Sequence, residues 1–80
     1  MSTATKVVDL LADVTEVDEV RDNLDLPLYD TQVLDSLKTV DLILAFEAAF
    51  GVEIPPAEFE RDEWATPRKI IAYMERRIGA

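Results

Sequence analysis

The stretch VLDSLKTVDLILAFEAAFG, residues 33–51, predicts the longest helix of the chain. Its apolar residues recur at the three- and four-residue spacing of a helix. We expect this helix to run from about Ser36 to Phe50, because Gly51 suits the left-handed position that follows a helix end. The stretch also contains Ser36, one of two serines in the chain; the other is Ser2.

The apolar residues of this helix fall into two groups when they are plotted at about 100° per residue. One group can face a core: Thr39, Leu42, Ile43, Phe46 and Phe50. The other group is Leu37, Val40 and Leu44, here called the apolar strip, with Asp41 near its edge. The apolar strip can either pack on the preceding loop or remain exposed beside carboxylates, which would make it a docking surface for partner proteins.

The segment before this helix predicts another helix and a long loop. Ser2 or Thr3 can cap a helix that ends near Thr15. Its apolar stripe comprises Val7, Val8, Leu10, Leu11 and Val14. Residues 16–33 break the helical pattern with Pro27 and several aspartates, so they predict a loop that can hold one short helical turn and is attached to the core by its leucines.

The segment after the helix predicts an extended stretch, a short helix or turn, and a last helix. Pro55 and Pro56 disfavour helix after the extended residues 52–54. Residues 57–64 can form the short helix or turn, and Thr66 and Pro67 suit the start of the last helix. Its expected inward residues are Ile70, Ile71, Met74 and Ile78, and Phe59, Trp64 and Tyr73 are assigned mainly to packing. We therefore expect an all-α fold, a small bundle of three main helices plus one short helix, in a single domain of residues 1–80.

The composition excludes several classes of activity. The 80 residues include no histidine and no cysteine, so the commonest general base, nucleophile and transition-metal ligands are missing. Two glycines cannot build a phosphate-binding loop, and the acidic run 18–30 lacks the glycine and the final glutamate of an EF-hand. We expect no catalytic residue and no metal site.

The net charge of −9 predicts partners with basic faces. Nucleic acids and anionic bilayers would repel the chain, so neither is expected as a direct partner. The N-terminal residues lack the pattern of a signal peptide, and no apolar run approaches the length of a membrane span. We expect a cytoplasmic protein without membrane insertion, and a monomer.

Ser36 has two interpretations from its position at the start of a helix. The commoner one makes it the N-cap. Asp35 could take the cap equally well, which would leave the Ser36 hydroxyl directed at solvent, where backbone N–H groups and the positive helix end suit a phosphate ester. A serine hydrolase is excluded, because the flanking residues Asp35 and Leu37 form no nucleophile elbow and no histidine is present.

Around Ser36 the chain resembles a known family. The residues 34–55, LDSLKTVDLILAFEAAFGVEIP, are similar to the second helix of the carrier proteins of acyl, peptidyl and aminoacyl transfer. The motif of that family is Asp-Ser-Leu, with the serine modified by 4′-phosphopantetheine, and it matches Asp35, Ser36 and Leu37. The residues 58–74, EFERDEWATPRKIIAYM, are similar to the D-alanyl carrier subgroup. Lys38 departs from that subgroup, in which many members have glycine.

The resemblance implies a non-catalytic carrier. A holo-carrier-protein synthase, which is a phosphopantetheinyl transferase, would attach 4′-phosphopantetheine to Ser36, with Asp35 as the flanking motif residue. A D-alanine ligase would load the arm, and a membrane-bound acyltransferase, met at its cytoplasmic face, would receive D-alanine for (lipo)teichoic acid of the cell wall. Leu37, Val40, Asp41 and Leu44 are the candidate partner-binding residues.

Two alternatives remain open from the sequence. The chain could be an acyl or peptidyl carrier of fatty-acid or nonribosomal synthesis. It could also be an acidic helical interaction module without a prosthetic group, which would use the apolar strip to bind a partner helix.

Overall fold

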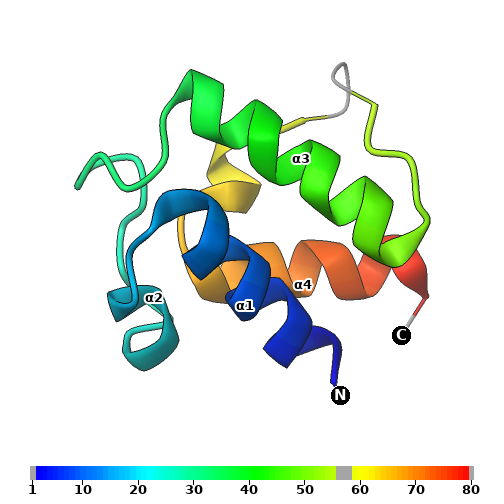
Figure 1. Cartoon of the computed structure of the whole chain (residues 1–80), viewed down its shortest axis with the longest axis horizontal. Helices are drawn as coiled ribbons and strands as arrows, with labels where there is room; N and C mark the ends of the chain where they lie inside the picture. Colours follow the sequence, from blue (N-terminus) through cyan, green and yellow to red (C-terminus); the bar gives the residue numbers. More distant parts are fainter. Residues whose placement is uncertain (1, 56–58, 80) are drawn as a thin grey trace.

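In the computed structural model, which describes residues 2–55 and 59–79, the chain folds into helices joined by loops (Figure 1). The elements are α1 (Thr3–Thr15), α2 (Glu19–Asp22), α3 (Ser36–Phe50), the 3₁₀ helix η2 (Arg61–Trp64) and α4 (Pro67–Ile78). The expected all-α bundle of three main helices is confirmed, as is a short helical turn in the loop after α1. Of the segment expected to form a short helix or turn, residues 61–64 are helical; Pro56 and residues 57–58 lie outside the described residues.

Side chains and glycines at the helix ends explain where the main helices begin and stop. Ser2 Oγ accepts the N–H of Thr5 at the start of α1, and Thr66 Oγ1 accepts the N–H of Lys69 at the start of α4. Both contacts satisfy a backbone donor that has no partner within its own helix. At the end of α3, Gly51 adopts φ 67° and its N–H donates to Glu47 O at 2.9 Å. Glycine tolerates this left-handed conformation without a steric cost, so α3 ends there.

The core forms where α1 packs against α3 and α4, with η2 against α4. Leu11, Leu42, Phe46 and Ile70 are fully buried within it. Trp64 is also fully buried, and its ring centroid lies 5.5 Å from each of three others, those of Phe46, Phe59 and Tyr73. The assignment of these aromatic residues to packing is therefore confirmed.

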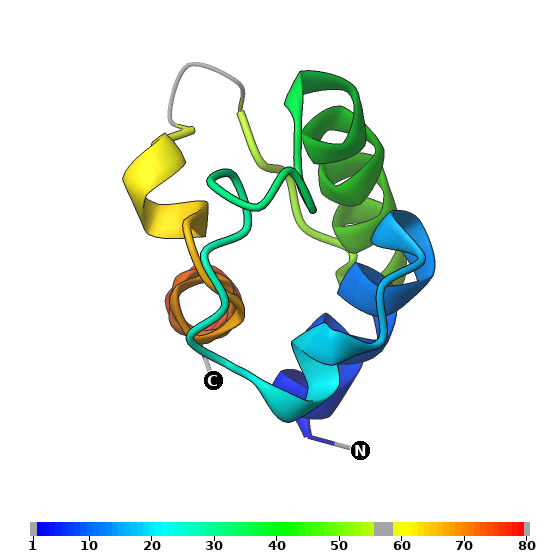
Figure 2. The same cartoon turned by 90° about the vertical axis from the view of Figure 1, so that its left-hand side faces the viewer.

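The loop between α2 and α3 is attached to the start of α4 by backbone hydrogen bonds. The N–H of Leu28 donates to Ala65 O at 2.8 Å, and the N–H of Arg68 donates to Leu24 O at 2.9 Å. Leu26 and Leu28 are buried and Leu24 is half-buried, as expected for a loop held by its leucines, and the following Leu34 is buried as well. Seen from the side, this loop runs between η2 and the first turn of α3 (Figure 2), so it brings α4, η2 and the Ser36 region together.

Within residues 2–55 and 59–79, none of the helices combines the length and the apolar character needed to span a membrane.

Candidate functional site

Ser36 is the first residue of α3, and Asp35 is its N-cap. A carboxylate oxygen of Asp35 accepts the backbone N–H of Lys38 at 2.8 Å. The interpretation of Ser36 as the capping residue is therefore wrong. The reason is geometric: the backbone of Asp35 is extended, with φ −139°, as a capping residue requires, whereas Ser36 already belongs to the helix.

The Ser36 side chain is exposed, and none of the described residues gives its hydroxyl a hydrogen bond. It lies at the end of α3 that points away from the first turn of α1 and the last turn of α4 (Figure 1). Free backbone N–H groups and the positive end of the helix dipole favour negative charge at this position. A phosphate ester on this oxygen therefore fits the surroundings that the chain provides.

Two neighbouring pockets are lined by Ser36 in the described part of the chain. One, of about 350 Å³, is also lined by Tyr29, Gln32, Leu34, Asp35 and Arg61. The other, of about 240 Å³, is lined by Tyr29, Thr39, Val40, Ile43, Phe59 and Arg61 in addition to Ser36. We call the second pocket the α3–η2 groove. Because Tyr29 and Arg61 belong to both pockets, they lie on the boundary between them.

Tyr29 connects the two walls of this region. Its hydroxyl lies 2.8 Å from Thr39 Oγ1 on α3, and the Arg61 guanidinium lies over its ring, 4.2 Å from the ring centroid. Partial burial raises the pKa of Tyr29, while the hydrogen bond with Thr39 and the charge of Arg61 oppose that rise. Tyr29 is therefore held by contacts of its hydroxyl and of its ring, and it forms a fixed boundary of the Ser36 region.

The apolar strip is exposed beside Ser36. The exposed fractions of Leu37, Val40 and Leu44 are 79%, 54% and 58%, and Asp41 is exposed as well. The alternative in which the strip packs on the preceding loop is therefore wrong, because the buried leucines of that loop contact other parts of the core. The other face of α3 is buried through Thr39, Leu42 and Phe46, which leaves the strip as an outward face next to the motif.

Lys38 points away from the apolar strip, toward the end of α1. Its Nζ donates to Thr15 O at 3.4 Å, and the residue is half-buried. A cation at a helix C-terminus interacts favourably with the helix dipole. Lys38 thus links α3 to α1 and does not extend the exposed face formed by the strip.

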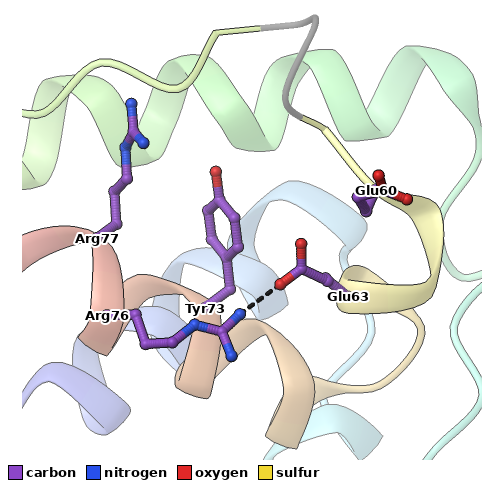
Figure 3. A pocket seen from close by; sticks show the side chains of 5 residues that line it. All are labelled: Glu60, Glu63, Tyr73, Arg76 and Arg77. Carbon is purple, nitrogen blue, oxygen red and sulfur yellow. Dashed lines mark hydrogen bonds and ion pairs between the residues drawn. The ribbon is translucent and has the colours of Figure 1, made fainter.

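A further pocket among the described residues lies between η2 and α4 (Figure 3), and Ser36 is not among the residues that line it. It has a volume of about 480 Å³ and is lined by Glu60, Glu63, Tyr73, Arg76 and Arg77. Arg76 pairs with Glu63, and Nε of Arg77 donates to the backbone oxygen of Glu53 at 2.9 Å. Its cations are thus engaged by the chain itself, and we place the candidate site at Ser36.

The structure adds Tyr29, Thr39 and Arg61 to the residues that the sequence had indicated near Ser36. Arg61 lies 25 positions along the chain from Ser36, and Tyr29 lies in the preceding loop. No spacing rule connects such residues, because their proximity depends on how the loop packs between two helices. The one available signal was that Arg61 falls within the segment 58–74 that resembles the D-alanyl carriers.

Comparison with known proteins defines the class of this site. The model of the phosphopantetheine attachment site family matches residues 5–74. An exposed serine on a helix N-terminus is the arrangement that such an attachment needs, so the class is that of the phosphopantetheine-bearing carrier proteins.

Within this class, relatives that match most of the chain are D-alanyl carrier proteins. The one from Lacticaseibacillus casei (strain BL23) is 53% identical over 70 residues, covering 88% of this chain and 86% of its own. The one from Latilactobacillus sakei subsp. sakei (strain 23K) is 44% identical over 72 residues, covering 90% and 92%. The one from Listeria innocua serovar 6a is 41% identical over 75 residues, covering 94% and 96%. The chain belongs to the D-alanyl carrier protein family, and its cofactor is a covalently attached 4′-phosphopantetheine.

Proposed function

We propose that Ser36 is the attachment point and that the whole chain, residues 1–80, acts as one non-catalytic carrier domain. The observation that carries this proposal is the exposed Ser36 hydroxyl, which makes no hydrogen bond with residues 2–55 and 59–79, on a helix whose cap is supplied by Asp35. Because Asp35 satisfies the N–H of Lys38, modification of Ser36 removes no hydrogen bond seen among the described residues. The chain can therefore accept the group without a structural cost at the helix start.

The attachment is a phosphoryl transfer from coenzyme A catalysed by a separate holo-carrier-protein synthase. Ser36 Oγ forms a bond to the phosphorus of the phosphopantetheine. The bond from this phosphorus to the bridging oxygen of the coenzyme A diphosphate breaks, and 3′,5′-ADP leaves with the electron pair. The hydroxyl proton goes to a base of the synthase. The group supplies a thiol, which this cysteine-free chain lacks, and that thiol can hold an amino acid as a thioester.

The cargo that we propose is D-alanine. A separate D-alanine ligase would load it, and a membrane-bound acyltransferase would take it at the cytoplasmic face for D-alanylation of (lipo)teichoic acid in cell wall biogenesis. The support is the family membership and the similarity to relatives that are named D-alanyl carrier proteins. The carrier itself would work in the cytoplasm as a monomer.

We propose that these partners recognise the apolar strip together with Asp41. The strip gives a partner an apolar contact beside the attachment serine, and the carboxylate adds charge complementarity to a basic partner. Electrostatic complementarity mainly affects the rate of association and the choice of partner, which suits a carrier that visits several enzymes in turn.

Mass spectrometry after incubation with coenzyme A and a phosphopantetheinyl transferase tests the attachment site. The wild type is expected to gain the mass of one phosphopantetheine, and Ser36→Ala to gain none. Ser2→Ala is the matched control, since Ser2 is the other serine of the chain, and it should be modified like the wild type. A gain that persists in Ser36→Ala would refute the assignment.

Loading of the modified protein tests the cargo and the partner surface. D-alanine ligase with ATP should form a thioester, whereas a preference for a fatty acid or another amino acid would favour the acyl or peptidyl carrier alternative. Val40→Asp should slow loading, because it places a charge in the apolar strip. Glu75→Gln, an exposed change on α4, is the control and should load normally. If Val40→Asp loads at the wild-type rate, Val40 is not part of the surface that the ligase recognises.

A further inference from the structure

Arg61 differs from the other arginines of the chain in its contacts. Arg21, Arg68 and Arg76 each form an ion pair with a carboxylate, and Arg77 donates to a backbone oxygen. Arg61 instead lies over the Tyr29 ring, and no carboxylate within the described residues pairs with it. In a protein with net charge −9, an exposed arginine that pairs with no carboxylate of residues 2–55 and 59–79 is available to another anion.

The location of Arg61 places this cation beside Ser36. Both residues line the pocket of about 350 Å³ and the α3–η2 groove of about 240 Å³. Neither Lys38 nor any other lysine or arginine among the described residues lines these pockets. Arg61 is therefore the cation that the fold brings to the attachment serine.

The charge at this place favours a bond between Arg61 and a phosphate. Asp35 also lines the pocket of about 350 Å³, and its carboxylate repels a negative group on the neighbouring Ser36 oxygen. Arginine can offset that repulsion and can donate two parallel hydrogen bonds to one phosphate. Stacking on Tyr29 orients the guanidinium in advance, which lowers the entropy lost when it binds an anion.

The α3–η2 groove has walls that suit the rest of the arm. Val40, Ile43 and Phe59 supply apolar surface, and Thr39 lies among them. The pantoyl part of phosphopantetheine carries two methyl groups next to its phosphate ester. An arm whose phosphate lies at Arg61 can therefore place these methyl groups against the apolar residues of the groove.

From this arrangement we infer that Arg61 binds the phosphate of the arm and holds the resting arm in the α3–η2 groove. The inference rests on the proposed attachment at Ser36. It assigns Arg61 as a positioning residue: the arm lies against the carrier between visits to its partners and leaves when a partner competes for it. Because Val40 belongs both to the groove and to the apolar strip, a partner that contacts the strip also reaches the place where the arm rests.

Phosphorus-31 NMR of the modified protein tests this inference directly. The intact mass of the protein is measured first. If the protein carries no phosphopantetheine, both this inference and the proposed attachment are overturned. In the modified wild type, the phosphodiester signal should be broad and shifted from its position in the same protein unfolded by urea. In Arg61→Gln, the signal should narrow and move toward that unfolded reference.

Two further variants separate charge, geometry and general surface effects. Arg61→Lys keeps the charge without the planar fork and should give an intermediate shift. Arg68→Gln is the matched control, because Arg68 is also exposed but lines neither pocket, and its signal should equal that of the wild type. Raising the salt concentration should move the wild-type signal toward the unfolded reference and leave Arg61→Gln unchanged.

A second measurement follows Arg61 itself in the wild type. The ¹H–¹⁵N signal of its Nε–H should shift between the unmodified and the modified protein, while that of Arg68 should not. The inference is refuted if the Arg61 Nε–H signal does not shift on modification and the phosphorus signal is the same in the wild type and in Arg61→Gln. That result would leave the attachment at Ser36 standing.

Discussion

The phenol oxygen of Tyr29 lies 2.8 Å from Oγ1 of Thr39, which joins the loop before the Asp35-Ser36-Leu37 motif to the buried face of α3. Thr39 is almost fully buried, so its hydroxyl depends on this partner for a hydrogen bond with another side chain. The Arg61 guanidinium lies over the ring of the same tyrosine. One side chain thus fixes both the loop and the cation beside Ser36.

Removing this hydrogen bond should lower the stability of the fold modestly. Tyr29→Phe and Thr39→Val should each reduce the free energy of unfolding by about 0.5–1.5 kcal/mol, the net value of a typical hydrogen bond. Urea denaturation measures both variants and the double variant. The double variant should cost less than the sum of the two single changes, because the bond can be lost only once. Strict additivity would show that the two hydroxyls are not coupled.

The N-cap of α3 should depend on Asp35 and be independent of Ser36. Asp35→Ala should reduce the free energy of unfolding by about 0.5–2 kcal/mol, because the N–H of Lys38 loses its acceptor. Asp35→Asn keeps an acceptor oxygen and should lose much less. Ser36→Ala should stay within about 0.5 kcal/mol of the wild type, as surface changes usually do. A large loss of stability in Ser36→Ala would contradict the assignment of the cap to Asp35.

Glu47 holds the chain that follows α3. Its Oε2 accepts the N–H of Ile54 at 2.9 Å, and the side chain of Ile54 is buried. Glu47→Ala should therefore reduce the free energy of unfolding by about 1–3 kcal/mol, because a largely desolvated N–H loses its partner. The amide of Ile54 should also exchange its hydrogen faster. Glu47→Gln retains an acceptor, and a loss equal to that of Glu47→Ala would argue against this role.

The ion pair of Asp25 and Arg68 should make the free energy of unfolding decrease as the pH falls in the acid range. The hydrogen bond from Arg68 and its charge lower the pKa of Asp25. The pKa of Asp25 is lower in the folded protein than in the unfolded chain, where it is about 3.9. At pH values between these two pKa values, the unfolded chain binds the proton more readily than the folded protein does. The contribution of Asp25 is thus fully present above the unfolded value and is lost as the pH falls through the folded one.

Asp25→Asn tests this dependence. The variant should be less stable than the wild type at neutral pH, and the difference should shrink as the solution is acidified. Both side chains are exposed, so the effect should be small and should weaken with added salt. Unfolding free energies from urea titrations at several pH values measure it. A difference that stays constant through the acid range would mean that the ion pair does not set the pKa.

Much of the fold followed from local patterns in the sequence. The apolar spacing, Ser2 and Thr66 as caps, Pro67 and Gly51 indicated the three main helices, because each of these signals acts within one or two helical turns. The two faces of α3 were also readable from its periodicity. The choice of capping residue was not, because Asp35 and Ser36 are both good caps and only the backbone conformation separates them.

The sequence by itself determined that this chain is a small acidic helical protein with a candidate attachment serine at a helix start. Only the tertiary structure decided which side chains surround that serine. Leu26, Leu28 and Leu34 of the loop between α2 and α3 are buried in the core. The apolar strip remains exposed, and Tyr29 lies between Thr39 and Arg61. These contacts join residues far apart in the chain, and such contacts are set by the packing of whole elements, not by the spacing of residues within any one of them.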